Sequence, residues 1–109
     1  MATPSLPSNA VIRVSRGDFD QGRFVEVDQM TRDTGRYLIP AIQQLDGLIS
    51  YYAGASSEGS MVHVSVWQSN EHADQMGRLK EMIVDARNDA DAVGVKFIPI
   101  VNYPIAWQI

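Results

Sequence analysis

The sequence contains no cysteine, which excludes disulfides, a thiolate nucleophile and any zinc or iron–sulfur site with cysteine ligands. Histidine is also scarce, because His63 and His72 are the only two in the chain. His72 lies beside Glu71 and Asp74, whose carboxylates can bind metals, but no ligand spacing recurs and helix-start polarity explains these residues more simply. We therefore expect neither a metal site nor a bound cofactor.

Positive charge is sparse as well. Nine Lys and Arg stand against thirteen Asp and Glu, for a net charge of −4, and the basic residues are scattered rather than clustered. This pattern predicts no nucleic-acid partner. No apolar run approaches the length of a membrane span, and the N-terminus lacks the basic start and apolar segment of a secretion signal. We expect a cytoplasmic protein that binds no membrane.

Strand and helix patterns alternate along the 109 residues, which are enough for one domain. A flexible tail is expected at residues 1–9, and the single domain at residues 10–109. Pro40 and the irregular spacing near Gly35 predict a kink or two pieces in the first helix. The predicted elements are strand 10–16, helix 21–45, strand 48–54, hairpin loop 56–60, strand 61–67, helix 70–87, strand 96–102 and an extended tail over 103–109.

This order predicts a ferredoxin-like α+β sandwich. With right-handed crossovers, the order strand–helix–strand–strand–helix–strand gives an antiparallel sheet with strand order 4-1-3-2. Both helices then pack on one face of the sheet and leave the other face open. The first and third strands form the central pair, so their side chains decide the character of the open face.

The third strand has two different faces, one of valines and one of mixed polarity. We expect the valines, with Ile12 and Val14, to face the helices. The open face would then carry Val11, Arg13, Ser15, Met61, His63, Ser65 and Trp67. Such a face is too apolar for water and too polar for a dry core. We therefore expect a homodimer in which two sheets pair face to face and the C-terminal strand is covered by the partner subunit.

Three segments carry a family resemblance: IRVSRGDF, LIPAIQQLDGLISYYAG and VHVSVWQSNEHADQM. Over about residues 10–109 the chain resembles the dimeric α+β barrel superfamily, in particular antibiotic-biosynthesis-monooxygenase-like domains. The resemblance implies a dimer with paired C-terminal strands. Some members are cofactor-independent oxygenases of polycyclic aromatic substrates, whereas others degrade haem. The haem-degrading members carry a second tryptophan and an axial histidine where this chain has Met76 and Ala86, so haem degradation is not expected.

The resemblance implies a small-molecule enzyme similar to cofactor-independent monooxygenases, acting on an aromatic or quinol-like substrate. His63 would be a general base and Arg13 would hold an anionic substrate, while Trp67, Tyr51, Ser65 and Met76 would contact it. Each has a simpler interpretation: a hydrogen-bonded structural histidine, an ion pair across the dimer, and packing residues. The alternative function is a non-catalytic small-ligand-binding or stress-associated dimer of the same fold.

Overall fold

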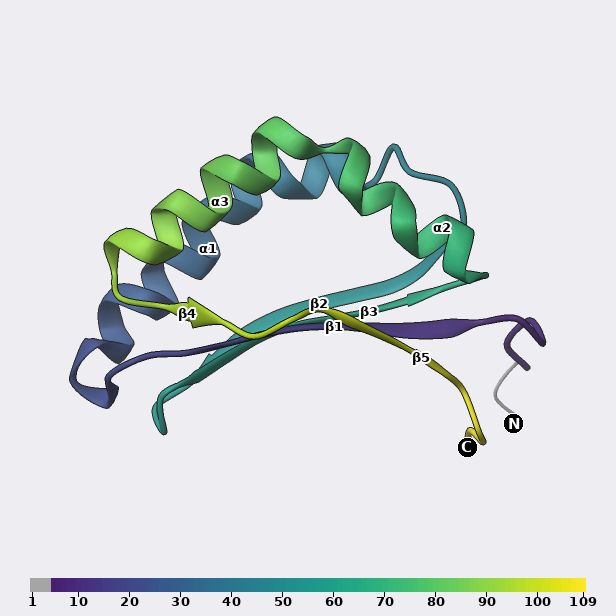
Figure 1. Cartoon of the computed structure of the whole chain (residues 1–109), viewed down its shortest axis with the longest axis horizontal. Coiled ribbons are helices and arrows are strands. Elements are labelled where there is room, and N and C mark those ends of the chain that lie inside the picture. Colours follow the sequence, from purple (N-terminus) through teal and green to yellow (C-terminus); the bar gives the residue numbers. More distant parts are fainter. Residues whose placement is uncertain (1–4) are drawn as a thin grey trace.

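The computed structural model describes residues 5–109. The strands are β1 (Val11–Asp18), β2 (Leu48–Ser56), β3 (Ser60–Trp67), β4 (Lys96–Phe97) and β5 (Val101–Pro104). The α-helices are α1 (Phe24–Ile42), α2 (Asn70–Asp74) and α3 (Lys80–Ala92), with short 3₁₀ turns at Gln21–Arg23 and Gln75–Arg78. All helices lie on one side of the sheet (Figure 1). None of the helices in this described range is long and apolar enough to cross a membrane.

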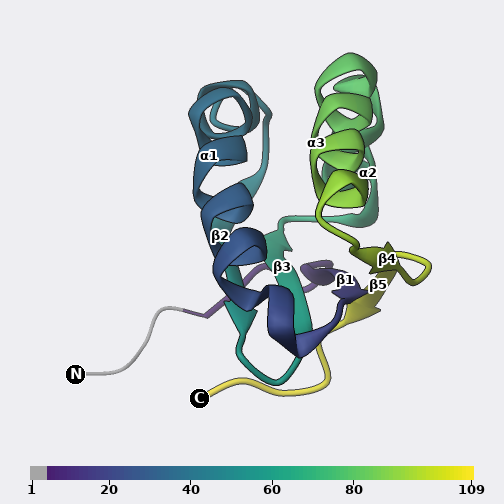
Figure 2. The same cartoon turned by 90° about the vertical axis from the view of Figure 1, so that its left-hand side faces the viewer.

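The sheet is antiparallel with strand order β2-β3-β1-β4, and β5 also pairs with β1. This is the predicted ferredoxin-like order, and it is confirmed. Figure 2 shows α1 over the β2 side of the sheet and α3 over the β4 side. The central pair runs in register from Val11 opposite Trp67 to Asp18 opposite Ser60. Side chains on this pair therefore define the middle of the space under the helices.

The helices differ from the prediction in where they are interrupted. The first is continuous from Phe24 to Ile42, although Pro40 lies inside it, in its last turn. The second, expected over 70–87, is divided into α2 and α3 by a 3₁₀ turn that contains Gly77. Leu79 leaves helical geometry at φ −90° and ψ 40°. Ser69 caps α2 as expected, accepting a hydrogen bond from the His72 amide at 3.2 Å.

The C-terminal segment forms two short strands rather than one strand over 96–102. Ile98–Ile100 interrupt the pairing with β1, and Pro99 within them has no N–H to donate. Residues 105–109 form no strand within the described chain, although the Leu6 amide donates to Gln108 Oε1 at 3.2 Å. Pairing of this tail with a partner subunit stays a prediction. The expected flexible tail, residues 1–9, lies partly outside the described residues.

The two faces of the sheet are assigned the opposite way from the prediction. Arg13, His63 and Ser65 line a cavity together with Leu38 of α1 and Ile83 of α3, so the mixed face is the one under the helices. The valines of β3 therefore lie on the open face with Ile12 and Val14. Alternation along a strand separates two faces but does not say which one is covered. Met61 and Trp67, which are 2% and 0% exposed, fill the space under the helices better than valines would.

The core has two parts that leave polar side chains between them. One cluster, at the Trp67 end of the sheet, includes Leu38 and Met76, and the other includes Met30 and Met61. These four side chains also line the cavity that holds Arg13 and His63. The candidate site therefore lies between the two apolar clusters, inside one subunit.

Candidate functional site

A polar row crosses the covered face of the sheet. Tyr51 of β2 is opposite Ser65 of β3, Ser65 is opposite Arg13 of β1, and Arg13 is opposite Asn102 of β5. Residues opposite each other in register point to the same face of a sheet. The row therefore brings Tyr51, Ser65 and Arg13 together under the helices, as three of the predicted site residues.

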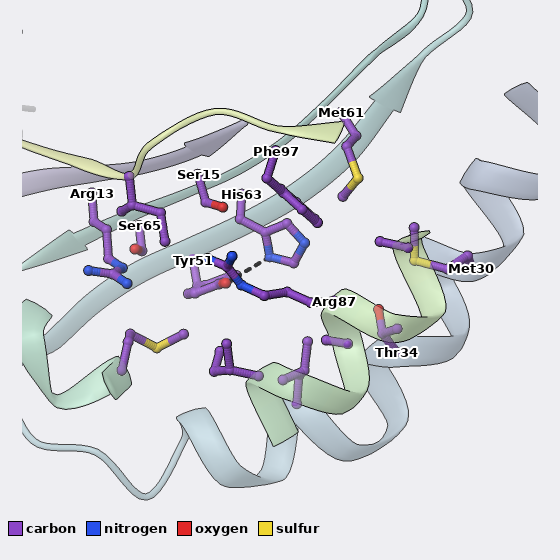
Figure 3. Close-up of a pocket in the computed structure, with 16 residues that line it drawn as sticks. Arg13, Ser15, Met30, Thr34, Tyr51, Met61, His63, Ser65, Arg87 and Phe97 are labelled. Atoms are coloured by element: carbon purple, nitrogen blue, oxygen red, sulfur yellow. Dashed lines mark hydrogen bonds between the residues drawn. The ribbon is translucent and has the colours of Figure 1, made fainter. Parts of the chain in front are cut away.

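The inner cavity lies between this row and the helices (Figure 3). Its volume is about 70 Å³, which is room for roughly two water molecules. Predicted site residues Arg13, Tyr51, His63, Ser65 and Met76 all line it. Its other lining residues are Ser15, Met30, Thr34, Leu38, Met61, Ile83, Ala86, Arg87, Ala90, Phe97 and Ile100. The cavity is thus within the subunit, and not between two sheets as the expected faces implied.

Tyr51 and His63 form a buried pair in the cavity wall. Tyr51 Oη lies 2.7 Å from His63 Nδ1, and the two rings meet edge to face at a centroid distance of 5.6 Å. Burial lowers the pKa of His63, and burial raises the pKa of Tyr51 to about 12 although Arg13 opposes this shift. Both groups are therefore neutral at pH 7. A neutral imidazole can accept a proton.

Trp67 is placed in the core rather than in the cavity. Its Nε1 donates a 2.8 Å hydrogen bond to Ser65 Oγ, and it is not among the residues that line this cavity. The packing interpretation of Trp67 fits this position. The Ser65 hydroxyl faces the cavity while already bonded to the indole.

Arg87 of α3 is a cavity residue that the sequence interpretation missed. Its guanidinium carbon lies 5.5 Å from the centroid of the Phe97 ring, which is a cation–π contact. A signal was present, because Arg87 is four residues after Ile83 and so lies on the same side of its helix as that cavity residue. The charged side chain hid this position from a search for apolar periodicity.

Burial lowers the pKa of Arg13, the positive charge of Arg87 lowers it further, and Tyr51 and Asp74 oppose the shift. Asp74 makes no salt bridge with Arg13, and its Oδ1 instead accepts a hydrogen bond from Asn102 Nδ2 at 3.3 Å. The oxygen of the same side-chain amide, Asn102 Oδ1, is buried and has no hydrogen-bond partner among the described residues. Arg13 is therefore held in a polar setting without a direct ion-pair partner among the described residues.

A larger outer cleft of about 490 Å³ lies between α1 and β2. Thr34, Leu38, Tyr51 and His63 line both this cleft and the inner cavity. The two spaces therefore adjoin each other at these shared residues. Small-molecule sites commonly measure about 300–1,000 Å³, so the outer cleft has the size of a ligand site and the inner cavity does not.

The described residues contain no group of three His, Asp or Glu side chains that could hold a metal ion. His72, the other histidine, lies away from the cavity, and its Nδ1 is 2.7 Å from Ser69 Oγ at the start of α2. The polarity around Glu71 and Asp74 is therefore that of a capped helix start.

No protein-family model matches the sequence, and no curated protein matches it significantly. Solved structures do match its fold. SnoaB, a cofactor-independent oxygenase from Streptomyces nogalater, is 13% identical with a TM-score of 0.58, and the match covers 93% of this chain and 96% of that one. The monooxygenase ActVA-Orf6 of Streptomyces coelicolor, solved with nanaomycin D, is 14% identical with a TM-score of 0.67, covering 94% and 93%.

A dimeric ferredoxin-like protein from an uncultured marine organism is 9% identical with a TM-score of 0.69, and the match covers 92% of this chain and 98% of that one. The likeness is one of fold. The chain has a ferredoxin-like fold that it shares with these oxygenases and with an antibiotic-biosynthesis-monooxygenase-like protein from Deinococcus radiodurans, as the sequence resemblance implied. At these identities the activity of a neighbour does not transfer to this chain.

Proposed function

We propose that the protein is a cofactor-independent monooxygenase that acts on an aromatic or quinol-like substrate. The observation that carries this proposal is the buried Tyr51–His63 pair, which lies in the wall shared by the inner cavity and the ligand-sized outer cleft. A general base there meets a substrate in the cleft in surroundings shielded from water. The occurrence of oxygenases among proteins of the same fold also supports it.

In the proposed reaction, His63 accepts a proton from the activated CH₂ group of a hydroxyaromatic substrate such as an anthrone. The carbanion that remains gives one electron to O₂, and the resulting radical and superoxide combine to form a C–O bond. The peroxide takes up the proton from His63. Loss of the second C–H proton with cleavage of the O–O bond then leaves a ketone and water, so the substrate supplies all four electrons.

The neighbouring side chains have distinct roles in this proposal. In the tautomer whose Nδ1–H donates to Tyr51 Oη, the His63 Nε2 lone pair can accept the substrate proton. Tyr51 is a positioning residue that holds the imidazole ring through this hydrogen bond. Arg13 stabilises the negative charge that develops on the substrate oxygen, and such stabilisation is strong where water is excluded. Leu38 and Met76 supply apolar lining beside these polar groups.

We also propose that the protein is a homodimer formed through its open sheet face and C-terminal strand. The open face carries the valines of β3 and the exposed aromatic Tyr52, which is 67% exposed. The C-terminal segment adds Tyr103 and Trp107, which are 50% and 77% exposed. A contiguous apolar surface of this kind is typical of an interface between subunits.

One observation favours the alternative of a non-catalytic ligand-binding or stress-associated protein. The inner cavity of about 70 Å³ is too small for a ring system, and Tyr51 Oη and His63 Nδ1 are already hydrogen-bonded to each other without a ligand. A protein that only binds a ligand would use the outer cleft, and its ligand would not have to place a reacting atom beside His63.

Oxygen consumption separates the two functions. The purified protein is incubated with an anthrone and with a naphthohydroquinone in an oxygen-electrode cell, and the product is identified by mass spectrometry in ¹⁸O₂. We expect one ¹⁸O atom in the product and a loss of about a hundredfold or more in kcat for His63→Ala. His72→Gln, which changes the histidine outside the cavity, should keep the wild-type rate. Equal rates for wild type and His63→Ala, or no oxygen uptake at all, would overturn the monooxygenase proposal.

A further inference from the structure

We propose that Arg13 and Arg87 together bind a carboxylate of the ligand in the inner cavity, so that the ligand class is an aromatic carboxylic acid. The inference deepens the proposed function by naming the substrate class, and it relies on that function only for the location of the site. It holds equally for a protein that binds this ligand without turning it over.

The charge of the cavity lining is the first observation. Two arginines line the inner cavity, and no aspartate or glutamate does, although the whole chain carries a net charge of −4. The outer cleft differs, because its Arg32 forms a 3.0 Å ion pair with Asp28. Of these two spaces, the inner cavity is therefore the one lined by arginines without an ion-pair partner.

The geometry of the two guanidinium groups is the second observation. Arg13 extends from the sheet and Arg87 from α3, so they reach the cavity from opposite layers (Figure 3). Neither forms an ion pair with any side chain in the described range 5–109. Stacking on Phe97 holds Arg87 in place without using its N–H donors. The donors of both groups remain available to a ligand.

An anion between the arginines would remove two unfavourable terms at once. Arg13 is desolvated, and it is repelled by Arg87, and both effects lower its pKa. A carboxylate can accept two parallel hydrogen bonds from one guanidinium. Its remaining lone pairs can accept hydrogen bonds from a second guanidinium. Asp74 does not fill this place, because it makes no ion pair with Arg13 and is bonded to Asn102 instead.

The volumes of the two spaces fix how the ligand lies. The inner cavity of about 70 Å³ accommodates two oxygen atoms of a carboxylate but not a ring, whereas the outer cleft of about 490 Å³ accommodates a ring system. The ligand therefore extends from the arginines past Tyr51 and His63 into the cleft. In this pose the ring carbon that neighbours the carboxylate-bearing carbon lies beside the imidazole of His63.

Calorimetry with a matched pair of probes tests the proposal. The probes are 1-hydroxy-2-naphthoate and 1-hydroxy-2-naphthamide, which have nearly the same shape and differ in charge. At pH 7 we expect the acid to bind roughly ten- to a hundredfold more tightly than the amide. The preference should shrink to about one in Arg87→Gln and in the double variant with Arg13→Gln. Arg36→Gln, a control on the exposed surface of α1, should keep it.

Equal affinity for acid and amide in the wild type, or a preference that survives in Arg87→Gln and in the double variant, would overturn the proposal. Arg87 is on the surface of α3, so the single variant keeps the test decisive even where loss of Arg13 prevents folding. The result is independent of oxygen consumption. Tight binding of the acid without turnover would contradict only the oxygenase proposal. Turnover of neutral quinols without a preference for acids would contradict only the proposed carboxylate site.

Discussion

The indole Nε1 of Trp67 donates a 2.8 Å hydrogen bond to the hydroxyl of Ser65, two residues earlier on the same face of β3, and these residues are 0% and 2% exposed. Ser65→Ala leaves the indole N–H buried without a partner, so we expect the free energy of unfolding to fall by about 1–3 kcal/mol. Urea denaturation measures this change. Ser57→Ala, in the exposed turn between β2 and β3, should change stability by less than about 0.5 kcal/mol. A Ser65→Ala protein as stable as the wild type would contradict the expectation.

The lowered pKa of His63 predicts a pH dependence of stability in acid. Because burial lowers the folded-state pKa below the unfolded value of about 6.5, the unfolded chain binds a proton first as the pH falls. The contribution of His63 to stability is therefore fully present above about pH 6.5 and is lost as the pH falls through the window below it. Urea unfolding at pH 7.5 and pH 5.0 should show a larger loss for the wild type than for His63→Gln. An equal loss would show that His63 titrates normally.

Gly47 has φ +77°, and an added Cβ would collide with the ring of His72. Gly47→Ala should therefore destabilise the fold by about 1–3 kcal/mol. Gly77 offers a matched control, because a Cβ at that position meets nothing within 4 Å. Gly77→Ala should leave stability unchanged or raise it by up to about 1 kcal/mol. Thermal melts of the two variants measure the contrast, and a lower midpoint for Gly77→Ala than for Gly47→Ala would be the opposite result.

The proposed homodimer predicts that charge on the open sheet face separates the subunits. Val64 lies at the middle of that face, paired between Val14 and Tyr52. Sedimentation velocity should give twice the 12.1 kDa chain mass for the wild type and the single-chain mass for Val64→Lys. Val84→Lys, on the exposed surface of α3, should sediment like the wild type. A wild-type protein of single-chain mass would rule out the dimer.

The strand order and the membership of each face followed from the sequence, because alternation along β1 and β3 determines which side chains share a face. The choice between the faces did not follow. It depends on how Met61 and Trp67 fill the volume under the helices, and that is a property of the assembled layers. Likewise Arg13, Tyr51 and His63 were predicted as site residues, while Arg87 was missed because a charged, exposed helix residue has no place in an apolar pattern.

Asn102 is the last member of the polar row that crosses the sheet, and it is also part of the C-terminal strand proposed to meet a second subunit. It lies directly opposite Arg13, and its buried oxygen has no partner anywhere in residues 5–109. The strand proposed to join two copies of the chain is therefore paired directly with the strand that carries a cavity arginine.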